Sequence, residues 1–412
     1  SLDVILAAQF EARRDERPGR VAVAVPAPAG AALPAPTVPI PSVRTASEPI
    51  PSARVPSARV PSARVPSARV PAAPRAPAAR AHAVRVAWVY PAHSPARVAE
   101  EQGVTARLRE QGHDVRAFGI PCAHWYTFPE LDRRYRGRDP ALMAAYERLG
   151  EELSGRDVLV AAGGSMLHPD FVARFDGVSV FCSADDPENS ELLSRPVAPH
   201  FDVALVVNPT SVAAYRAWGC AHVEPIFPAL RPERIAAGVS RESILGEERP
   251  LDVVLCCERE YGLSDRAQRV EALLRAFPAA TVRGPGWPLG PQPQVELYPR
   301  ARLGWNLHNS TGPCNTRFLE LPANGVLQLC DNPDEIGRWF VPGEEIVGFA
   351  SLDECIDLTH HFLRHEDERR RIAANGHARV LRDYTEAKWF ERMLAAVARA
   401  QAGAARPTAA AR

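Results

Sequence analysis

Short apolar runs that alternate with helix-like segments constrain this sequence more than any other feature. Residues 84–90 form an apolar run that predicts a β-strand, and residues 96–110 carry Val98, Val104 and Leu108 on one side of a predicted helix. Gly112 ends that helix, and residues 114–118 predict the next strand. A strand, a helix and a second strand in this order favour a parallel pair of strands, so the folded part of the chain begins as an α/β sheet.

The same alternation continues in two series, separated by a proline-rich, charged passage at 227–250. Further strands are predicted at 157–162, 178–181, 203–207, 222–224, 252–257, 281–283, 303–307 and 326–330, and further helices at 211–218, 265–277, 316–321, 352–363, 366–384 and 386–399. Continuous apolar strands of this kind belong to sheets that helices cover on both faces. The predicted fold class is therefore α/β, with two Rossmann-like doubly wound domains whose crevices, at the carboxyl ends of the strands, face one cleft.

The segment before residue 84 cannot take part in such a fold. Residues 21–80 consist largely of Pro, Ala, Val, Ser and Arg, contain no aromatic residue, and include tandem PSARV repeats at 51–70. A proline at every fifth position removes backbone donors and excludes both helix and sheet. We predict a disordered, semi-rigid spacer at 1–83; a docking tail for a proline-reading partner is the alternative.

Composition narrows the classes of partner and compartment. A formal net charge of +0 provides no field that would attract nucleic acid or an anionic membrane. No apolar run approaches the roughly 18 residues of a membrane span, and no signal peptide is recognisable at the start. The eight cysteines lack paired or metal-ligand spacing, and Cys256-Cys257 lies within an apolar run, which favours buried thiols. We expect a cytoplasmic protein without a bound metal.

A polar loop at 307–314 connects the strand at 303–307 to the helix that follows. Free backbone N–H groups at such a helix start favour an anion. Arg317 lies in the first turn, where a cation opposes the helix dipole unless it meets an anion such as a diphosphate. Glu320, one turn later, suits two ribose hydroxyls. An ordinary helix start, with Asn315 or Thr316 as its cap, explains the same residues equally well.

Residues 315–385 strengthen the first interpretation by resemblance. Asn315, Arg317, Phe318 and Glu320, followed by PGEEI at 342–346 and by IAANGHARV at 372–380, resemble the carboxyl-terminal domain of the spore-maturation (CgeB-like) glycosyltransferases of the GT-B group. The resemblance implies transfer of a sugar from a UDP-, GDP- or dTDP-linked donor to an unknown acceptor, without a metal or another cofactor. It also implies an acceptor-side domain at 84–240, a donor domain at 241–385, a carboxyl-terminal helix at 386–400 and a tail at 401–412.

The candidate site residues fall into two groups. The predicted donor-binding residues are Asn315, Thr316, Arg317, Glu320, Arg259, Arg266 and His308. A catalytic base is expected from the first domain, where three candidates follow predicted strands: Asp185, Asp186 and His93. His168 is a weaker candidate base.

Two features depart from the family pattern. Pro322 lies inside the predicted site helix, so we expect that helix to be short or kinked. No glycine follows the strand at 252–257 directly, which leaves the turn that approaches a phosphate shifted to Gly262 or absent. Gly163-Gly164 predicts a tight turn rather than a phosphate loop.

Three other functions remain open from the sequence. A metal-dependent GT-A-type transferase would use Asp185-Asp186 as its metal motif, and it predicts a single sheet domain. A non-catalytic sugar- or nucleotide-binding regulator would bind ligand without turnover. An epimerase of the same architecture would need no acceptor.

Overall fold

The computed structural model describes residues 84–183, 186–187, 189–259, 265–290, 292–308 and 315–404. All of them belong to one compact unit. The predicted disordered segment at 1–83 lies outside the described residues, as do residues 405–412 of the predicted tail.

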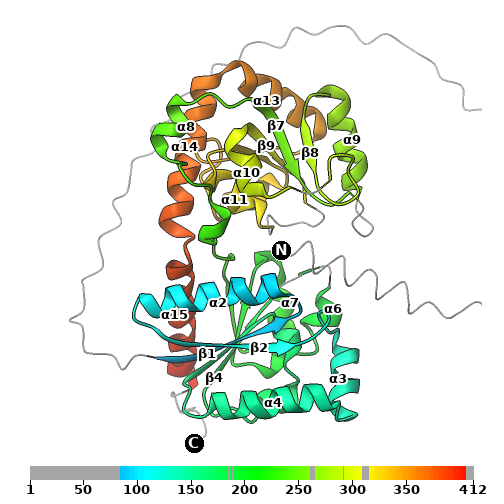
Figure 1. The fold of residues 1–412 in the computed structure, drawn as a ribbon, viewed down its shortest axis with the longest axis vertical. Coiled ribbons are helices and arrows are strands. Elements are labelled where there is room, and N and C mark those ends of the chain that lie inside the picture. The colour runs from blue at the N-terminus through cyan, green and yellow to red at the C-terminus, as the bar shows by residue number, and fades with distance from the viewer. Residues whose placement is uncertain are drawn as a thin grey trace, which may run out of the picture. The chain divides into compact units, whose positions relative to one another are not determined.

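The first sheet has six parallel strands in the order β2-β1-β3-β4-β5-β6 (Figure 1). Its strands are β1 (Arg85–Ala92), β2 (Asp114–Pro121), β3 (Val158–Ala162), β4 (Val178–Cys182), β5 (Val203–Val206) and β6 (His222–Pro225). The helices and 3-10 turns between them are α2 (Pro95–Glu110), α3 (Phe128–Arg136), α4 (Pro140–Leu153), η1 (Gly164–Met166), α5 (Pro169–Val172), α6 (Ser190–Leu193), η2 (Ala198–His200), η3 (Pro209–Ser211) and α7 (Val212–Ala217).

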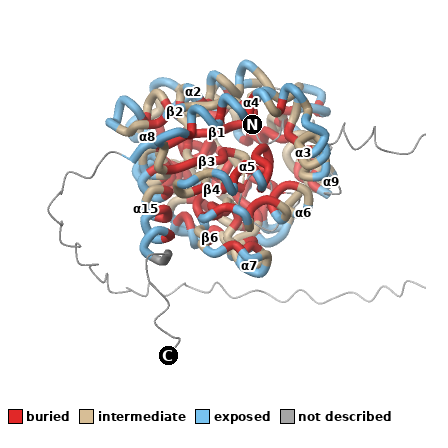
Figure 2. Tube along the Cα trace, turned by 90° about the horizontal axis from the view of Figure 1, so that it is seen from below, coloured by how far each residue is buried: buried red, intermediate tan, exposed pale blue. Residues whose placement is uncertain are grey.

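Both faces of the first sheet are buried, as continuous apolar strands require. In β1 the side chains of Val86 and Trp88 join a core with α2 and the carboxyl-terminal helix α15 (Glu386–Ala404). Ala87 and Val89 join the core on the opposite face, where α4 packs. Strands β1 and β3 accordingly appear as buried segments in Figure 2.

The second sheet has five parallel strands in the order β11-β10-β9-β7-β8 (Figure 1). Its strands are β7 (Leu251–Cys256), β8 (Thr281–Arg283), β9 (Ala301–Asn306), β10 (Leu327–Cys330) and β11 (Val347–Gly348). The accompanying helices and turns are η4 (Pro232–Arg234), α8 (Arg241–Gly246), α9 (Arg266–Ala276), α10 (Gln294–Leu297), η5 (Tyr298–Arg300), α11 (Arg317–Ala323), α12 (Pro333–Ile336), α13 (Leu352–Arg364) and α14 (Glu366–Asp383).

The predicted fold class is confirmed, with two parallel, doubly wound sheets. The single sheet domain expected for the metal-dependent GT-A alternative is wrong. The pattern did not predict α3, α4 and the two-residue strand β11. Helix α15 follows the second sheet in the sequence, yet its buried residues Phe390 and Met393 pack in the core of the first sheet.

Gly163 forms a tight turn after β3, as predicted. Its φ is 96°, a region that favours glycine. A Cβ at this position would lie 1.8 Å from the indole ring of Trp125, so the turn also requires the absence of a side chain. The turn thereby brings Trp125 against the end of β3.

None of the seven described cysteines forms a disulfide, and both Cys256 and Cys257 are buried as expected. Among the residues with described positions, no helix combines the length and the apolar composition that a bilayer crossing requires.

Candidate active site

The second sheet reverses its strand order between β7 and β9, since β8 lies beyond β7 and β10 lies beyond β9. Open α/β sheets bind ligands at such a switch point, outside the carboxyl ends of the strands. Here those ends are Cys256 of β7 and Asn306 of β9. Helix α11 begins at Arg317, after a loop of which residues 309–314 are not described.

Arg317 lies across the two strand ends. Its guanidinium donates hydrogen bonds to the carbonyl oxygens of Cys256 and Leu307, each at 3.1 Å, and its Nε donates to Asn306 Oδ1 at 3.1 Å. The residue is only 3% exposed. Buried backbone carbonyls need donors, so Arg317 links β7 to the end of β9 from inside the protein. Its predicted contact with a diphosphate stays a prediction.

A chain of buried amides supports the start and the body of α11. Asn315 Oδ1 accepts from the backbone N–H of Phe318 and thereby caps the helix, while Asn315 Nδ2 donates to Asn306. Asn306 in turn donates to Gln328 Oε1 at 2.6 Å. Gln328 then donates its Nε2 to the carbonyl oxygen of Phe318 at 3.2 Å.

This last hydrogen bond explains how a proline is tolerated inside α11. Pro322 has no N–H to donate to the Phe318 carbonyl four residues earlier, and Gln328 supplies a donor to that carbonyl instead. The helix is seven residues long, in agreement with the expected short helix. It ends where Asn324 donates to the Glu320 carbonyl and accepts from the N–H of Ala236.

Glu320 is 3% exposed and lies in the wall of a cavity of about 230 Å³. Thr316 and Leu319 of the same segment also line that cavity. The guanidinium of Arg234 lies close to Glu320, with 3.8 Å between Nε and Oε1. Glu320 therefore borders a space that a ligand can occupy, whereas Arg317 does not line it.

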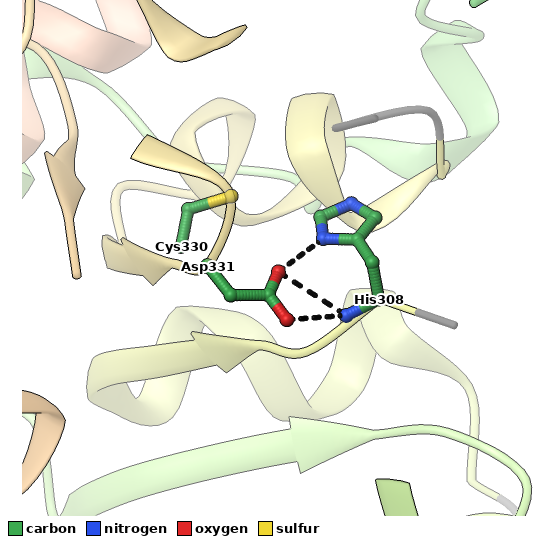
Figure 3. A group of neighbouring side chains, drawn as sticks. All are labelled: His308, Cys330 and Asp331. Atoms are coloured by element: carbon green, nitrogen blue, oxygen red, sulfur yellow. Dashed lines mark hydrogen bonds and ion pairs between the residues drawn. The ribbon is translucent and has the colours of Figure 1, made fainter. Parts of the chain in front are cut away.

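His308 and Asp331 form a buried pair beside these residues (Figure 3). The Nδ1 of His308 bonds to Asp331 Oδ1, and the backbone N–H of His308 donates to Asp331 Oδ2 at 2.9 Å. Burial lowers the pKa of His308, so the neutral ring keeps its Nδ1 proton for the carboxylate. The Nε2 of His308 is buried and has no hydrogen-bond partner among the described residues.

Cys330 brings a third potential metal ligand close to this pair, with all three ligand atoms within 4.8 Å of one another. Asp331 also pairs with Arg269 at 3.0 Å. The hydrogen bonds from His308 outweigh burial and lower the pKa of Asp331. A cation here would compete with Arg269 and with the His308 proton, so the cluster fits a hydrogen-bonded support of the β9 end better than a metal centre.

The other two arginines predicted to bind the donor differ in access. Arg266 is 3% exposed and donates to the Glu258 carbonyl at 2.7 Å. The side chain of Arg259 is 40% exposed, pairs with Glu271 and lies over the ring of Trp287. Arg259 can therefore meet a ligand in solvent without breaking a buried contact.

The three predicted catalytic residues are not equivalent. Asp185 lies outside the described residues. Asp186 is buried and accepts hydrogen bonds from Ser194 at 2.9 Å and from the Tyr215 hydroxyl. Burial raises the pKa of Asp186 in spite of these hydrogen bonds. The carboxylate is thus engaged in packing α6 and α7 against the end of β4, and it does not line the cavity.

His93 follows β1 and is partly exposed, and its Nε2 has no hydrogen-bond partner among the residues with described positions. Burial, and then the charge of Arg97, lower its pKa, which keeps a basic nitrogen unprotonated at neutral pH. His168, the weaker candidate, is buried, stacks on Tyr135 and accepts from the N–H of Asp170 as the cap of α5. These contacts give the ring of His168 a structural role.

A charged network that the sequence did not indicate lines one edge of the cavity. Glu101 of α2 accepts from Trp88 Nε1 at 2.7 Å, and it pairs with Arg97 at 2.9 Å and with Arg231 at 2.7 Å. Arg234 pairs with Glu100 at 3.2 Å. The pKa of Glu100 is low because Arg231 and Arg234 together outweigh its burial. The network joins α2 to the connection before the second sheet.

Some of the site residues that the sequence analysis did not name are marked by a sequence pattern, and others are not. Asn306 and Gln328 are polar residues inside continuous apolar runs, and Asp331 directly follows such a run, so each marks a strand position with a polar partner. Glu100 and Glu101 look like ordinary charged residues of an exposed helix face, and only the packing buries Glu101.

Comparison with known proteins bears on this geometry. Residues 265–395 match the model of a glycosyl transferase-like family. The match covers helix α11 with Arg317 and Glu320, the His308–Asp331 pair and part of α15. A search among curated proteins finds no match to the sequence.

Solved structures share the fold at low sequence identity. HepE of Anabaena in complex with UDP-glucose superposes with a TM-score of 0.54 at 12% identity, over 76% of this chain and 99% of HepE. The apo form of the lipopolysaccharide outer core galactosyltransferase WaaB gives a TM-score of 0.52 at 9% identity, over 76% of this chain and 99% of WaaB. Sucrose-phosphate synthase of Thermosynechococcus elongatus gives 0.50 at 12% identity, over 78% and 100%. The protein has the GT-B fold.

Proposed function

We propose that this protein is a glycosyltransferase that moves a sugar from a nucleotide-sugar donor to an acceptor hydroxyl. The observation that carries the proposal is the position of α11. This helix lies within the part of the chain that matches the glycosyl transferase-like family, it follows β9 at the switch point of the second sheet, and its Glu320 lines a cavity. That HepE was solved with UDP-glucose favours a UDP-linked donor.

The described contacts suggest distinct roles for the donor-binding candidates. We assign Glu320 to the ribose hydroxyls, since a carboxylate accepts two hydrogen bonds from a diol. Arg259 is our first choice for the diphosphate, because its guanidinium is the accessible one of the three arginines. Arg317, Asn315 and His308 would hold the strand ends and the helix start in place. Thr316, at the cavity wall, and Arg266, which donates to the Glu258 carbonyl, complete the donor set.

Transfer with inversion would require a base for the acceptor hydroxyl. His93, like Asp186, does not line the cavity, and it is our preferred candidate because its Nε2 has no hydrogen-bond partner among the described residues, whereas the Asp186 carboxylate bonds to Ser194 and Tyr215. A neutral imidazole with a low pKa can accept that proton at pH 7. The leaving diphosphate would be stabilised by guanidinium groups without a metal ion. Membership in the spore-maturation branch and a cytoplasmic location remain parts of this proposal.

A ligand screen tests the donor assignment. The protein's melting temperature is measured with UDP, GDP, dTDP and their sugars, with EDTA present, for the wild type and for Glu320→Gln. A nucleotide at a hundredfold excess over its Kd should add about 2.7 kcal/mol of stability. Glu320→Gln should reduce that shift, whereas Glu296→Gln, on the exposed side of α10, should leave it unchanged. The proposal fails if no nucleotide raises the melting temperature.

The chemical step is tested separately. With the best donor, release of free nucleotide is followed for the wild type and for His93→Gln. Loss of turnover with donor binding intact supports the base assignment, and equal rates refute it. An altered sugar released without transfer would favour the epimerase alternative, and binding without turnover the regulator. If EDTA abolishes turnover and a divalent cation restores it, the metal-free mechanism is wrong.

A further inference from the structure

The cavity beside Glu320 is mostly apolar. Its walls come from the core between the first sheet and helices α2 and α15, and they include Trp88, Val104, Leu108, Leu205, Ile226 and Trp389. Leu108 and Leu205 are almost fully buried. Trp88 and Trp389 meet edge to face at 5.5 Å. The cavity therefore reaches from the donor residues into the hydrophobic layer of the first sheet.

An apolar cavity of this kind favours an apolar occupant. A ligand that fills the space gains dispersion contacts with the lining side chains which the free protein lacks. Apolar cavities also hold water poorly, and one of about 150 Å³ is large enough for benzene. The volume of about 230 Å³ here is larger.

The charged residues at the edge of the cavity further limit the kind of ligand that the cavity can bind. Arg97, Arg231 and Arg234 meet the carboxylates of Glu100 and Glu101 in ion pairs. With Glu320 and Glu386, the lining of the cavity carries four carboxylates against these three guanidinium groups, so the edge is a poor site for a phosphate or another anion. It suits neutral hydroxyl groups, which can both donate to the carboxylates and accept from the guanidinium groups.

Apart from its flat base, whose edges are polar, a nucleotide sugar has no apolar part that would fill this volume. The apolar walls come from α2, α15 and the strands of the first sheet, whereas Thr316, Leu319 and Glu320 of the second-sheet side form only one border. We propose that the cavity binds a compact apolar group, an alkyl chain or an aromatic ring, carried by a neutral, hydroxyl-bearing acceptor. That the ligand is an acceptor rests on the proposed glycosyl transfer. That the ligand carries an apolar group rests on the cavity alone.

Titration with 1-alkanols tests the cavity directly. Butan-1-ol, hexan-1-ol and octan-1-ol are titrated into the full chain, with tryptophan fluorescence as the readout because Trp88 and Trp389 line the space. The affinity should rise about fourfold with each methylene until the cavity is full. Leu108→Phe, which fills the cavity, should weaken octan-1-ol binding at least tenfold.

Leu149→Phe is the matched control. Leu149 is a fully buried leucine of α4 in the opposite core of the same sheet, and it does not line the cavity. It should leave the alkanol affinity unchanged. If Leu108→Phe does not fold, Val104→Phe from the same wall repeats the test. Equal affinities in the wild type and the filled variants would overturn the proposal, since the alkanol would then bind elsewhere.

Titration with UDP separates this inference from the proposed function. Octan-1-ol and UDP should bind together, because the apolar walls and the donor residues are different parts of the molecule. Displacement of octan-1-ol by UDP would assign the cavity to the donor and overturn the inference. If UDP binds and octan-1-ol does not, the inference fails while the transferase proposal stands. If octan-1-ol binds and no nucleotide does, the apolar site stands and its occupant is no acceptor.

Discussion

The carboxyl ends of the two sheets are built in opposite ways. At the end of the second sheet, polar side chains fill the interior: Arg317, Asn306 and Gln328 satisfy one another and the nearby carbonyls through hydrogen bonds. At the end of the first sheet, the interior is apolar and holds an open cavity, and the charges lie at its edge. Both ends belong to parallel sheets of the same class.

The difference separates a rigid site from an adaptable one. A fully hydrogen-bonded buried network has one low-energy arrangement, since moving any member leaves a partner unsatisfied. An apolar cavity restricts the size of a ligand but hardly its orientation, so it accepts several ligands of similar size. This contrast fits a transferase whose donor is fixed and whose acceptor is recognised mainly by its bulk.

Removing the central donor of the polar network should have the largest effect. Arg317→Ala leaves the Cys256 and Leu307 carbonyls and Asn306 Oδ1 without a buried charged donor. We expect a loss of about 3–5 kcal/mol in the free energy of unfolding, measured by urea denaturation. Arg338→Ala, which removes an ion pair between the exposed Arg338 and the partly buried Glu335, should cost less than about 1 kcal/mol. Similar values for both variants would mean that Arg317 does not brace the strand ends.

Gly163 tests how tightly the cavity end of the first sheet is packed. Gly163→Ala combines a positive φ with a Cβ placed 1.8 Å from Trp125, and should cost about 2–4 kcal/mol in urea denaturation. Gly150 of α4 is the control, since a Cβ there meets nothing within 4 Å. Gly150→Ala should stabilise the protein by up to about 1 kcal/mol. A mild effect at Gly163 would show that the first-sheet end relaxes around Trp125, which would enlarge the contrast between the two ends.

Gln328 offers a finer test of the polar end. Gln328→Leu removes the donor to the Phe318 carbonyl and the acceptor for Asn306, and should cost about 1–3 kcal/mol. Pro322→Ala restores a backbone N–H that can reach the same carbonyl. The cost of Gln328→Leu should therefore be smaller in the Pro322→Ala background, as measured by a double-mutant cycle. Additive effects would show that Gln328 does not replace the hydrogen bond that proline removes.

The sequence predicts more of the structure at one of the two sheet ends than at the other. The strands and the short site helix that contains Pro322 follow from local patterns, because apolar runs, glycines and prolines act on their own neighbourhood. The role of Arg317 could not be read in this way, since one of its partners, the Cys256 carbonyl, is 61 residues away and meets it only through the pairing of β7 with β9. The cavity depends on α15 returning to the first sheet, which no local pattern indicates.

The smallest predicted effect concerns the support of α11 from behind. His377 of α14 is 5% exposed, bonds through Nδ1 to the Ala323 carbonyl at 2.8 Å, and has a pKa that burial lowers below 6.5. The unfolded chain, with the higher pKa, takes up a proton first as the pH falls. The contribution of the neutral His377 to the free energy of unfolding is thus complete at pH 7.5 and declines below about pH 6.5.

The wild type should therefore lose up to about 1 kcal/mol relative to His377→Gln between pH 7.5 and pH 5.5. Glutamine keeps a side-chain donor for the Ala323 carbonyl and has no proton to take up in this range. Urea denaturation of both proteins across that range checks the prediction. Parallel pH profiles would show that His377 accommodates a charge, and the support behind the polar end would then be less rigid than its hydrogen bonds suggest.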